Sequence, residues 1–367
     1  MNRCDPLVLL SGLPLDRKPS FLRQLDSLAA VWRQQGRSVF VGGPVIPDSD
    51  YERGNASWSG EGVSELGWCL VGLGEDSLSF AGVVSRTSPG ALIALGYPDQ
   101  FPFLSATRLP TYLWSQFSRP PKRVLPEPPT YIPLTEKTAL HLRTAGCSRI
   151  GPVIAHGVDT RLFSPLSERC SPPRTFVVGT VADNSRRKRI DLILRSFALF
   201  CRERPRSRLL IKTNRPASLD GVDLPALIAR ENVGDRVEII TTELTDAEMA
   251  ELYNRMDLYL NLSEWEGFCV PVIEAMACGV PVVGPPMQGP GEILPYQNTL
   301  APEGEFREEE GTELYQADPE AVAVLLVALA GDSSLRARLS REGREAALSR
   351  YDIRRIAAQW EGVLQRI

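Results

Sequence analysis

Residues 257–284 read DLYLNLSEWEGFCVPVIEAMACGVPVVG. The first six residues are an apolar run typical of a buried strand, and Pro271 stands where the first turn of a short helix would begin. Gly279 then marks the end of that helix, and VPVV follows as another strand. This stretch predicts a strand, loop, helix and strand of a parallel α/β sheet.

The same stretch places two carboxylates beside a predicted helix N-terminus. Ligands of open parallel sheets bind beyond the carboxyl ends of the strands, and a helix N-terminus with free N–H groups favours phosphate. Glu266 lies in the loop and Glu274 in the first helical turns, so the two could reach different hydroxyls of one ligand. The alternative is that Glu274 complements the helix dipole and that Glu266 is a solvated loop residue.

The surrounding sequence repeats this alternation of strand and helix twice. The run PLVLL, an amphipathic helix from about Pro19 to Gly36, and SVFVGG form one βαβ unit. After the polar, proline-rich residues 164–173, TFVVGTV, a helix and RLLIKT form a second series. Further apolar runs predict more strands: CLVGLG, AGVVS, ALIALG and TYLWSQF. From Asp318 the chain predicts two or three helices.

Length and charge bound the class of protein. At 367 residues the chain favours two domains, and a net charge of −4 excludes a polycation that would hold nucleic acid. Seven cysteines without a C-x-x-C pair argue against a disulfide framework or a zinc site, and fit a cytoplasmic location. We expect no secretion signal. We also expect no transmembrane segment, since the longest apolar run, Ala321–Ala330, has about half of the residues needed to span a bilayer. Peripheral membrane contact stays open.

These residues carry a family resemblance. EGFCVPVIE, from Glu266 to Glu274, resembles the E-x7-E signature of retaining glycosyltransferases of the GT-B fold, family 4. IAHGVDTRLFSP, VGTVADNSRRKRID and the closing RYDIRRIAAQWE are similar to further segments of that family. The resemblance covers the chain from roughly residue 133 to the end. It implies two Rossmann-like domains that face a central cleft, residues 1–165 for the acceptor and 166–350 for the nucleotide sugar, with a terminal helix, residues 351–367, packing back on the first.

The resemblance also implies roles around the donor. Glu266 would hold hydroxyls of the donor sugar, Glu274 would bind the ribose, and Lys188 would support the diphosphate, which gains charge as it leaves. Where the family has an arginine this chain has Ala182, so Arg187 or Arg186 would replace it. Further donor contacts implied are the backbone N–H groups of Phe268, Cys269 and Val270, the base loop at Leu244, and Gly12 after the first strand.

The sequence carries weaker signals for the residues that would bind the acceptor. Tyr97, Asp99 and Gln100 follow a strand of the first domain and are the candidates. His156 fits a structural role at the domain junction, and His141 fits a surface or packing role. The Asp48-Ser49-Asp50 triplet has the form of a metal-binding motif of a different fold, so we expect no metal and no cofactor.

We therefore interpret the chain as a metal-independent, retaining hexosyltransferase that uses a nucleotide-diphosphate sugar and a saccharide or glycoconjugate acceptor. The main alternative is an inactive glycosyltransferase-like scaffold that binds nucleotide sugar, favoured by Ala182 and the histidine-poor first domain. A sugar-nucleotide epimerase or a phosphorylase fits less well. The sequence leaves open the base, the sugar, the acceptor, the linkage and the oligomeric state.

Overall fold

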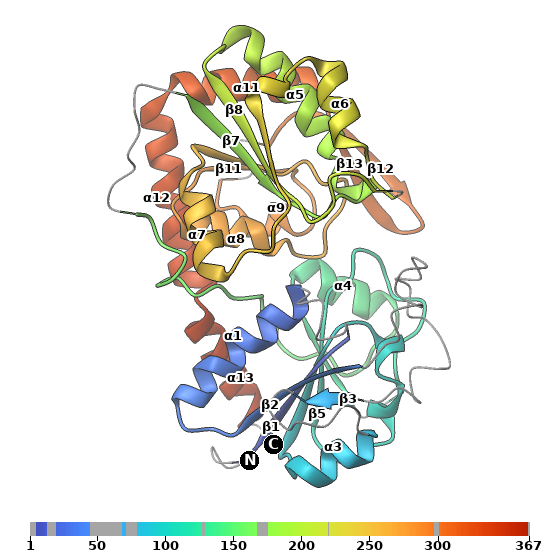
Figure 1. Ribbon diagram of the computed structural model, residues 1–367. Helices are drawn as coiled ribbons and strands as arrows, with labels where there is room; N and C mark the ends of the chain where they lie inside the picture. The colour runs from blue at the N-terminus through green and yellow to red at the C-terminus, as the bar shows by residue number, and fades with distance from the viewer. Residues whose placement is uncertain are drawn as a thin grey trace. The chain divides into compact units, whose positions relative to one another are not determined.

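The chain forms two compact α/β units. The computed structural model describes residues 5–12, 20–44, 68–70, 79–126, 129–166, 175–218, 220–296 and 301–365. Unit 1 consists of Met1–Gly157 with Ile353–Ile367, and unit 2 consists of Val158–Asp352. Figure 1 shows a twisted sheet with helices packed on it in each unit.

Unit 1 is built on a six-stranded sheet of order β3-β2-β1-β4-β5-β6, parallel except for the β2–β3 pair. Its elements are β1 (Leu7–Ser11), α1 (Ser20–Gln34), β2 (Val39–Pro44), β3 (Trp68–Leu70), α3 (Phe80–Thr87), β4 (Ala91–Leu95), the 3-10 turns η2 (Pro98–Gln100) and η3 (Pro102–Ser105), β5 (Thr111–Ser115), β6 (Thr130–Pro133), α4 (Glu136–Thr144) and α13 (Ile353–Leu364). The central strands β1, β4 and β5 are buried at every residue, which explains their continuous apolar runs.

One of the expected strands of unit 1 is a helix. The run AGVVS lies in α3, so the strand prediction was wrong there. The Ser79 side chain accepts a hydrogen bond from Gly82 N and caps this helix, whereas a short apolar run does not by itself separate a strand from a buried helix.

The last helix of the chain completes unit 1. In α13 the Trp360 side chain is fully buried, with its ring 5.5 Å from that of Trp114 and 5.9 Å from that of Tyr112, both in edge-to-face geometry. Arg37 and Glu361 form an ion pair at 2.6 Å that ties α13 to the chain beyond α1. The C-terminal residues therefore belong to the core of the N-terminal unit.

Unit 2 has a five-stranded parallel sheet of order β11-β10-β7-β8-β9 and a separate antiparallel hairpin, β12–β13. Its elements are β7 (Phe176–Val181), η4 (Arg186–Lys188), α5 (Ile190–Glu203), β8 (Ser207–Lys212), α6 (Leu224–Glu231), η5 (Gly234–Arg236), β9 (Val237–Ile240), α7 (Asp246–Asn254), β10 (Leu258–Leu260), α8 (Val270–Ala277), β11 (Val282–Val283), α9 (Pro290–Ile293), β12 (Gly304–Glu309), β13 (Thr312–Ala317), α11 (Pro319–Gly331) and α12 (Ser333–Arg350). Helices cover both faces, with α5 packed on α6 and α11, and α8 packed on α7 and α12 (Figure 1).

The division between the units falls at Gly157, earlier than the expected boundary at residue 165. The reason is that the residues after Gly157 are held by unit 2. Arg344 donates hydrogen bonds to the carbonyl oxygens of Thr160 and Phe163, at 2.9 and 2.8 Å. Most of the polar linker, residues 167–174, lies outside the described residues.

None of the helices within the described residues is long and apolar enough to cross a bilayer.

Candidate active site

The strand order of unit 2 fixes where a ligand site can form. Successive strands are laid down outward from β7 to β9, and the chain then returns to place β10 on the other side of β7. The loops that follow β7 and β10 therefore leave the sheet in opposite directions, and such a switch point is the position at which these sheets bind ligands. Residues 182–189 and 261–269 are these two loops.

Three charged side chains meet there. Glu266, from the loop after β10, accepts a hydrogen bond from Lys188 Nζ on Oε1 and one from Arg187 Nη1 on Oε2, the latter at 2.9 Å. The Ser263 hydroxyl also donates to Glu266 Oε1, at 2.8 Å. The sequence predicted Glu266, Lys188 and Arg187 as candidates, and the structure brings all three together.

Electrostatics keep this carboxylate ionised. Burial alone would raise the pKa of Glu266, but the charges of Lys188 and Arg187 and the hydrogen bonds from Lys188 and Ser263 outweigh it and lower the pKa to about 2. The cluster contains two cations and one anion, so it carries one net positive charge and favours an anionic ligand.

Arg187 is the accessible member of the cluster. Its side chain keeps 33% of its surface exposed, against 10% for Lys188. The guanidinium lies 4.9 Å from the ring centroid of Trp265, a cation–π contact that holds it beside Glu266. Arg186 is exposed, whereas Arg187 reaches the carboxylate. Ala182, where the family arginine was expected, directly follows β7 and donates its N–H to Lys212 O.

The N-terminus of α8 lies next to Glu266. Cys269 caps it with φ of 87°, a left-handed conformation that is unusual for a residue other than glycine. Its buried Sγ accepts a hydrogen bond from Asn261 Nδ2 at 3.0 Å. Burial, together with the nearby charge of Glu266, raises the pKa of the Cys269 thiol to about 12, so the thiol is neutral at pH 7 and is no nucleophile. Phe268 is buried against Tyr351, and Val270 is the first residue of α8.

Glu274 lies further along α8 and is buried. Its Oε2 accepts a hydrogen bond from the hydroxyl of Tyr253, on α7, at 2.7 Å. This contact orients the carboxylate. It is a more specific arrangement than a charge that only complements the helix dipole.

The hairpin β12–β13 supports the loop that carries Glu266. Tyr315 N donates to Glu264 O at 2.8 Å, and Arg307 forms an ion pair with the Glu264 carboxylate at 2.8 Å. Glu264 N in turn donates to Arg187 O at 2.7 Å, which joins the two loops through the backbone. At Gly289, with φ of 81°, a Cβ atom would lie 2.6 Å from Phe268 O, so only glycine allows this approach.

Leu244 lies at the residue before the capping residue Thr245 of α7, and is half-buried. A residue at this position is often apolar and forms a hydrophobic staple with the first turns of the helix. The loop that it belongs to follows β9 on the carboxyl side of the sheet.

The sheet of unit 1 also has a switch point, between β1 and β4. Gln100, which is buried, joins the loops after these strands: its Nε2 donates to Gly12 O at 3.0 Å, and its Oε1 accepts from Tyr97 N at 2.8 Å. Gln100 therefore orders the loop backbones. Tyr97 and Asp99 are the exposed members of this group of acceptor candidates.

Neither histidine lies at the described switch points. His156 is buried, with its ring 4.9 Å from that of Trp114, and burial lowers its pKa to about 3. His141 is a buried residue of α4. The burial of His141 favours the packing role over the surface role expected as its alternative.

The Asp48-Ser49-Asp50 triplet lies outside the described residues. Within the parts of the chain that the structure describes, no group of three or more His, Cys, Asp or Glu side chains could hold a metal ion.

Sequence reasoning missed three residues of the site. Ser263 and Trp265 stand within the quoted loop, next to Glu266, and their proximity to it was a signal. Tyr253 carried no signal, because its contact with Glu274 spans 21 positions and depends on how α7 packs against α8.

Sequence comparison finds a family match within unit 2. Residues 170–346 match the family model described as "Glycosyl transferases group 1". A GDP-mannose-dependent alpha-mannosyltransferase of Mycobacterium tuberculosis is 32% identical over 160 residues, which span 41% of this chain and 38% of that enzyme.

Solved structures cover both units. A sucrose-phosphate synthase from Thermosynechococcus elongatus has a TM-score of 0.74 at 17% identity, and covers 99% of this chain and 98% of its own. An Anabaena HepE structure in complex with UDP and glucose has a TM-score of 0.69 at 16% identity, and covers 99% of this chain and 100% of its own. The fold is GT-B. The predicted fold class of two Rossmann-like GT-B domains with C-terminal helices is confirmed.

Proposed function

We propose that this chain is a retaining glycosyltransferase that moves a hexosyl unit from a nucleotide-diphosphate sugar to a hydroxyl of a saccharide or glycoconjugate acceptor. The observation that carries the proposal is the cluster of Arg187, Lys188 and Glu266 at the switch point of unit 2. The match of residues 170–346 to glycosyl transferases group 1 supports it.

The residues have distinct roles in this proposal. Lys188 and Arg187 stabilise the diphosphate, whose negative charge grows as the glycosidic bond breaks. Glu266, with a pKa of about 2, is an anion at pH 7 and accepts hydrogen bonds from the donor sugar; it donates no proton. The carboxylate oxygens of Glu266 are held by three donors, which argues against a covalent intermediate on this residue.

Glu274 then binds the ribose hydroxyls, and the N–H groups of residues 268–270 face the sugar and the β-phosphate. No metal and no cofactor take part, because the two cations supply the positive charge that a metal would supply. Tyr97 and Asp99 are proposed to contact the acceptor. Cys201 and Cys269 are buried free thiols, which supports a cytoplasmic location.

The test combines binding with turnover. We would measure thermal stabilisation of the wild type by UDP, GDP and ADP, each with and without a hexose, since a ligand that binds the native state raises its stability. The expected result is stabilisation by one base, lost in Glu274→Ala. Glu266→Gln should then retain nucleotide binding and lose about 100-fold or more in turnover, as removal of a group that acts in the transition state does.

Glu264→Gln is the matched control, since Glu264 lies in the same loop but pairs with Arg307. If no diphosphate stabilises the wild type, the proposal fails.

The second candidate is a scaffold that binds nucleotide sugar without turnover, favoured by Ala182 in place of the family arginine. It predicts selective stabilisation by one nucleotide sugar, with no nucleoside diphosphate released in the presence of acceptor.

A further inference from the structure

A pocket opens at the amino-terminal edge of the unit 2 sheet. Phe176 and Ser207, the first residues of β7 and β8, line it together with Asp257, which precedes β10. Because these strands are parallel, their carboxyl ends, where Glu266 and Lys188 lie, are at the opposite edge of the same sheet. The pocket has a volume of about 580 Å³, within the range of sites for small molecules. Because it lies at the other edge of the sheet, the pocket is separate from the candidate active site.

Two arginines give this pocket its charge. Arg204 and Arg206 line it, and neither guanidinium makes a hydrogen bond or ion pair with any residue that the structure describes. The Arg204 guanidinium lies over the C-terminus of α11, where a Cβ atom at Gly331 would come within 2.9 Å of it. The negative end of the helix dipole holds the cation at this place.

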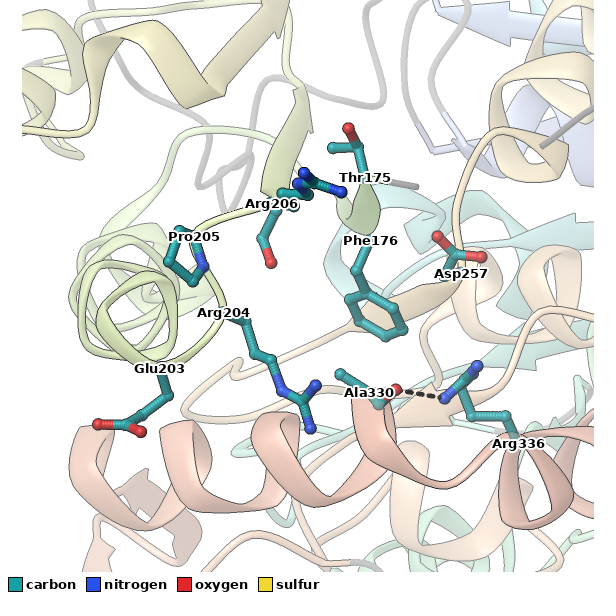
Figure 2. A pocket seen from close by; sticks show the side chains of 10 residues that line it. Thr175, Phe176, Glu203, Arg204, Pro205, Arg206, Asp257, Ala330 and Arg336 are labelled. Atoms are coloured by element: carbon teal, nitrogen blue, oxygen red, sulfur yellow. Dashed lines mark hydrogen bonds between the residues drawn. The ribbon is translucent and has the colours of Figure 1, made fainter. Parts of the chain in front are cut away.

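The other charged groups of the pocket are already engaged or directed elsewhere. Arg336 donates to Ala330 O at 2.9 Å and lies 5.4 Å from the ring centroid of Phe176. Asp257 accepts a hydrogen bond from Val177 N at 2.9 Å. Figure 2 shows the Glu203 carboxylate pointing away from the Phe176 ring. With three arginines and two carboxylates, the lining carries one net positive charge.

A buried hydroxyl also lies at the pocket. Ser207 is only 2% exposed, and among the described residues its Oγ has no hydrogen-bond partner. This hydroxyl lies in the pocket wall beneath the accessible surface, so it does not itself contact a ligand in the pocket. The Phe176 ring and Pro205 add apolar surface beside these polar groups (Figure 2).

We propose that this pocket binds a phosphate monoester of a small organic molecule. A phosphate monoester carries more negative charge than a carboxylate and has three terminal oxygens that accept hydrogen bonds, so it pairs more strongly with guanidinium groups. The organic part packs on Phe176 and Pro205. This site does not depend on the glycosyltransferase proposal.

The test is calorimetric titration of the full chain with phenyl phosphate, inorganic phosphate and benzoate at constant ionic strength. We expect phenyl phosphate to bind more tightly than either of the others. The double variant Arg204→Gln/Arg206→Gln should weaken its binding by about tenfold or more, as the loss of charge-assisted hydrogen bonds does.

Arg208→Gln is the matched control, since Arg208 is an exposed residue of the same strand that does not line the pocket. Its affinity should equal that of the wild type. The proposal is overturned if phenyl phosphate does not bind the wild type, or if the Arg204/Arg206 double variant binds it as tightly. Loss of binding in Lys188→Met alone would assign the phosphate to the active site instead.

Discussion

Arg187 and Glu266 form an ion pair at 2.9 Å, although 79 positions separate them in the chain. The pair joins the loop after β7 to the loop after β10 across the switch point of unit 2. It also places a partly exposed guanidinium beside a fully ionised carboxylate. This pair, its neighbours in unit 2, and the buried residues His156 and Gln100 of unit 1 each lead to a measurable effect.

Glu266 should contribute stability that depends on pH. Its folded-state pKa of about 2 lies below the ordinary glutamate value of 4.5, so the contribution is fully present above pH 4.5 and is lost as the pH falls toward 2. Chemical denaturation of wild type and Glu266→Gln between pH 6 and 3 should give a stability difference that changes only below pH 4.5, in the direction that favours the variant. A difference independent of pH would contradict the ionised, paired state of Glu266.

Arg187 should serve as the arginine that the family motif lacks at Ala182. Arg187→Gln should lower turnover by about 10- to 100-fold, the effect of losing a charge-assisted hydrogen bond to the leaving group. Arg186→Gln is the control, since Arg186 is exposed and one residue away. Steady-state kinetics with the donor found by thermal stabilisation would compare them. Equal losses in both variants would mean that the region acts only through its overall charge.

Tyr253 should position Glu274 for the nucleotide. Tyr253→Phe removes one hydrogen bond and should weaken binding of the nucleoside diphosphate by about three- to tenfold. Tyr296→Phe removes another buried tyrosine hydroxyl of unit 2, one bonded to Val282 N, and should lower stability without changing affinity. Calorimetric titration would separate the two variants. Unchanged affinity in Tyr253→Phe would remove the link between Tyr253 and the ligand.

His156 should make unit 1 sensitive to acid. Its folded-state pKa of about 3 lies below the ordinary value of 6.5, so the folded protein keeps it neutral while the unfolded chain takes up a proton. The stability of the wild type relative to His156→Phe should therefore fall between pH 6.5 and 3, by about 1.4 kcal/mol per pH unit. Denaturation midpoints of both proteins across this range provide the measurement. Parallel pH profiles would show that His156 is solvated.

Gly12 and Gln100 should be energetically coupled. A Cβ atom at residue 12 would lie 2.1 Å from Gln100 Oε1, so Gly12→Ala should cost about 1–3 kcal/mol by overpacking. Gln100→Ala removes the obstructing atoms, so the double variant should lose less stability than the sum of the two single variants. A double-mutant cycle by denaturant unfolding measures the coupling. Additive losses would mean that the loop after β1 moves to accept the new side chain.

The fold and the main site residues could be read from local patterns. Continuous apolar runs marked most of the buried strands. Pro271 and Gly279 marked the two ends of α8, which placed Glu266 before the start of this helix and Glu274 within it. These features depend on residues close together in the chain, so the sequence carries them directly. The run AGVVS failed because five residues are too few to show a helical period, and the cap at Ser79 decided its conformation.

Only the tertiary structure decided which arginine meets Glu266 and that Tyr253 holds Glu274. Each of these contacts joins segments that come together only when strands pair and helices pack on the sheet. The sequence supplied the charges and the hydroxyl, but their partners depend on the order β11-β10-β7-β8-β9 and on burial, which is also what holds the pKa of Glu266 and of His156 away from ordinary values.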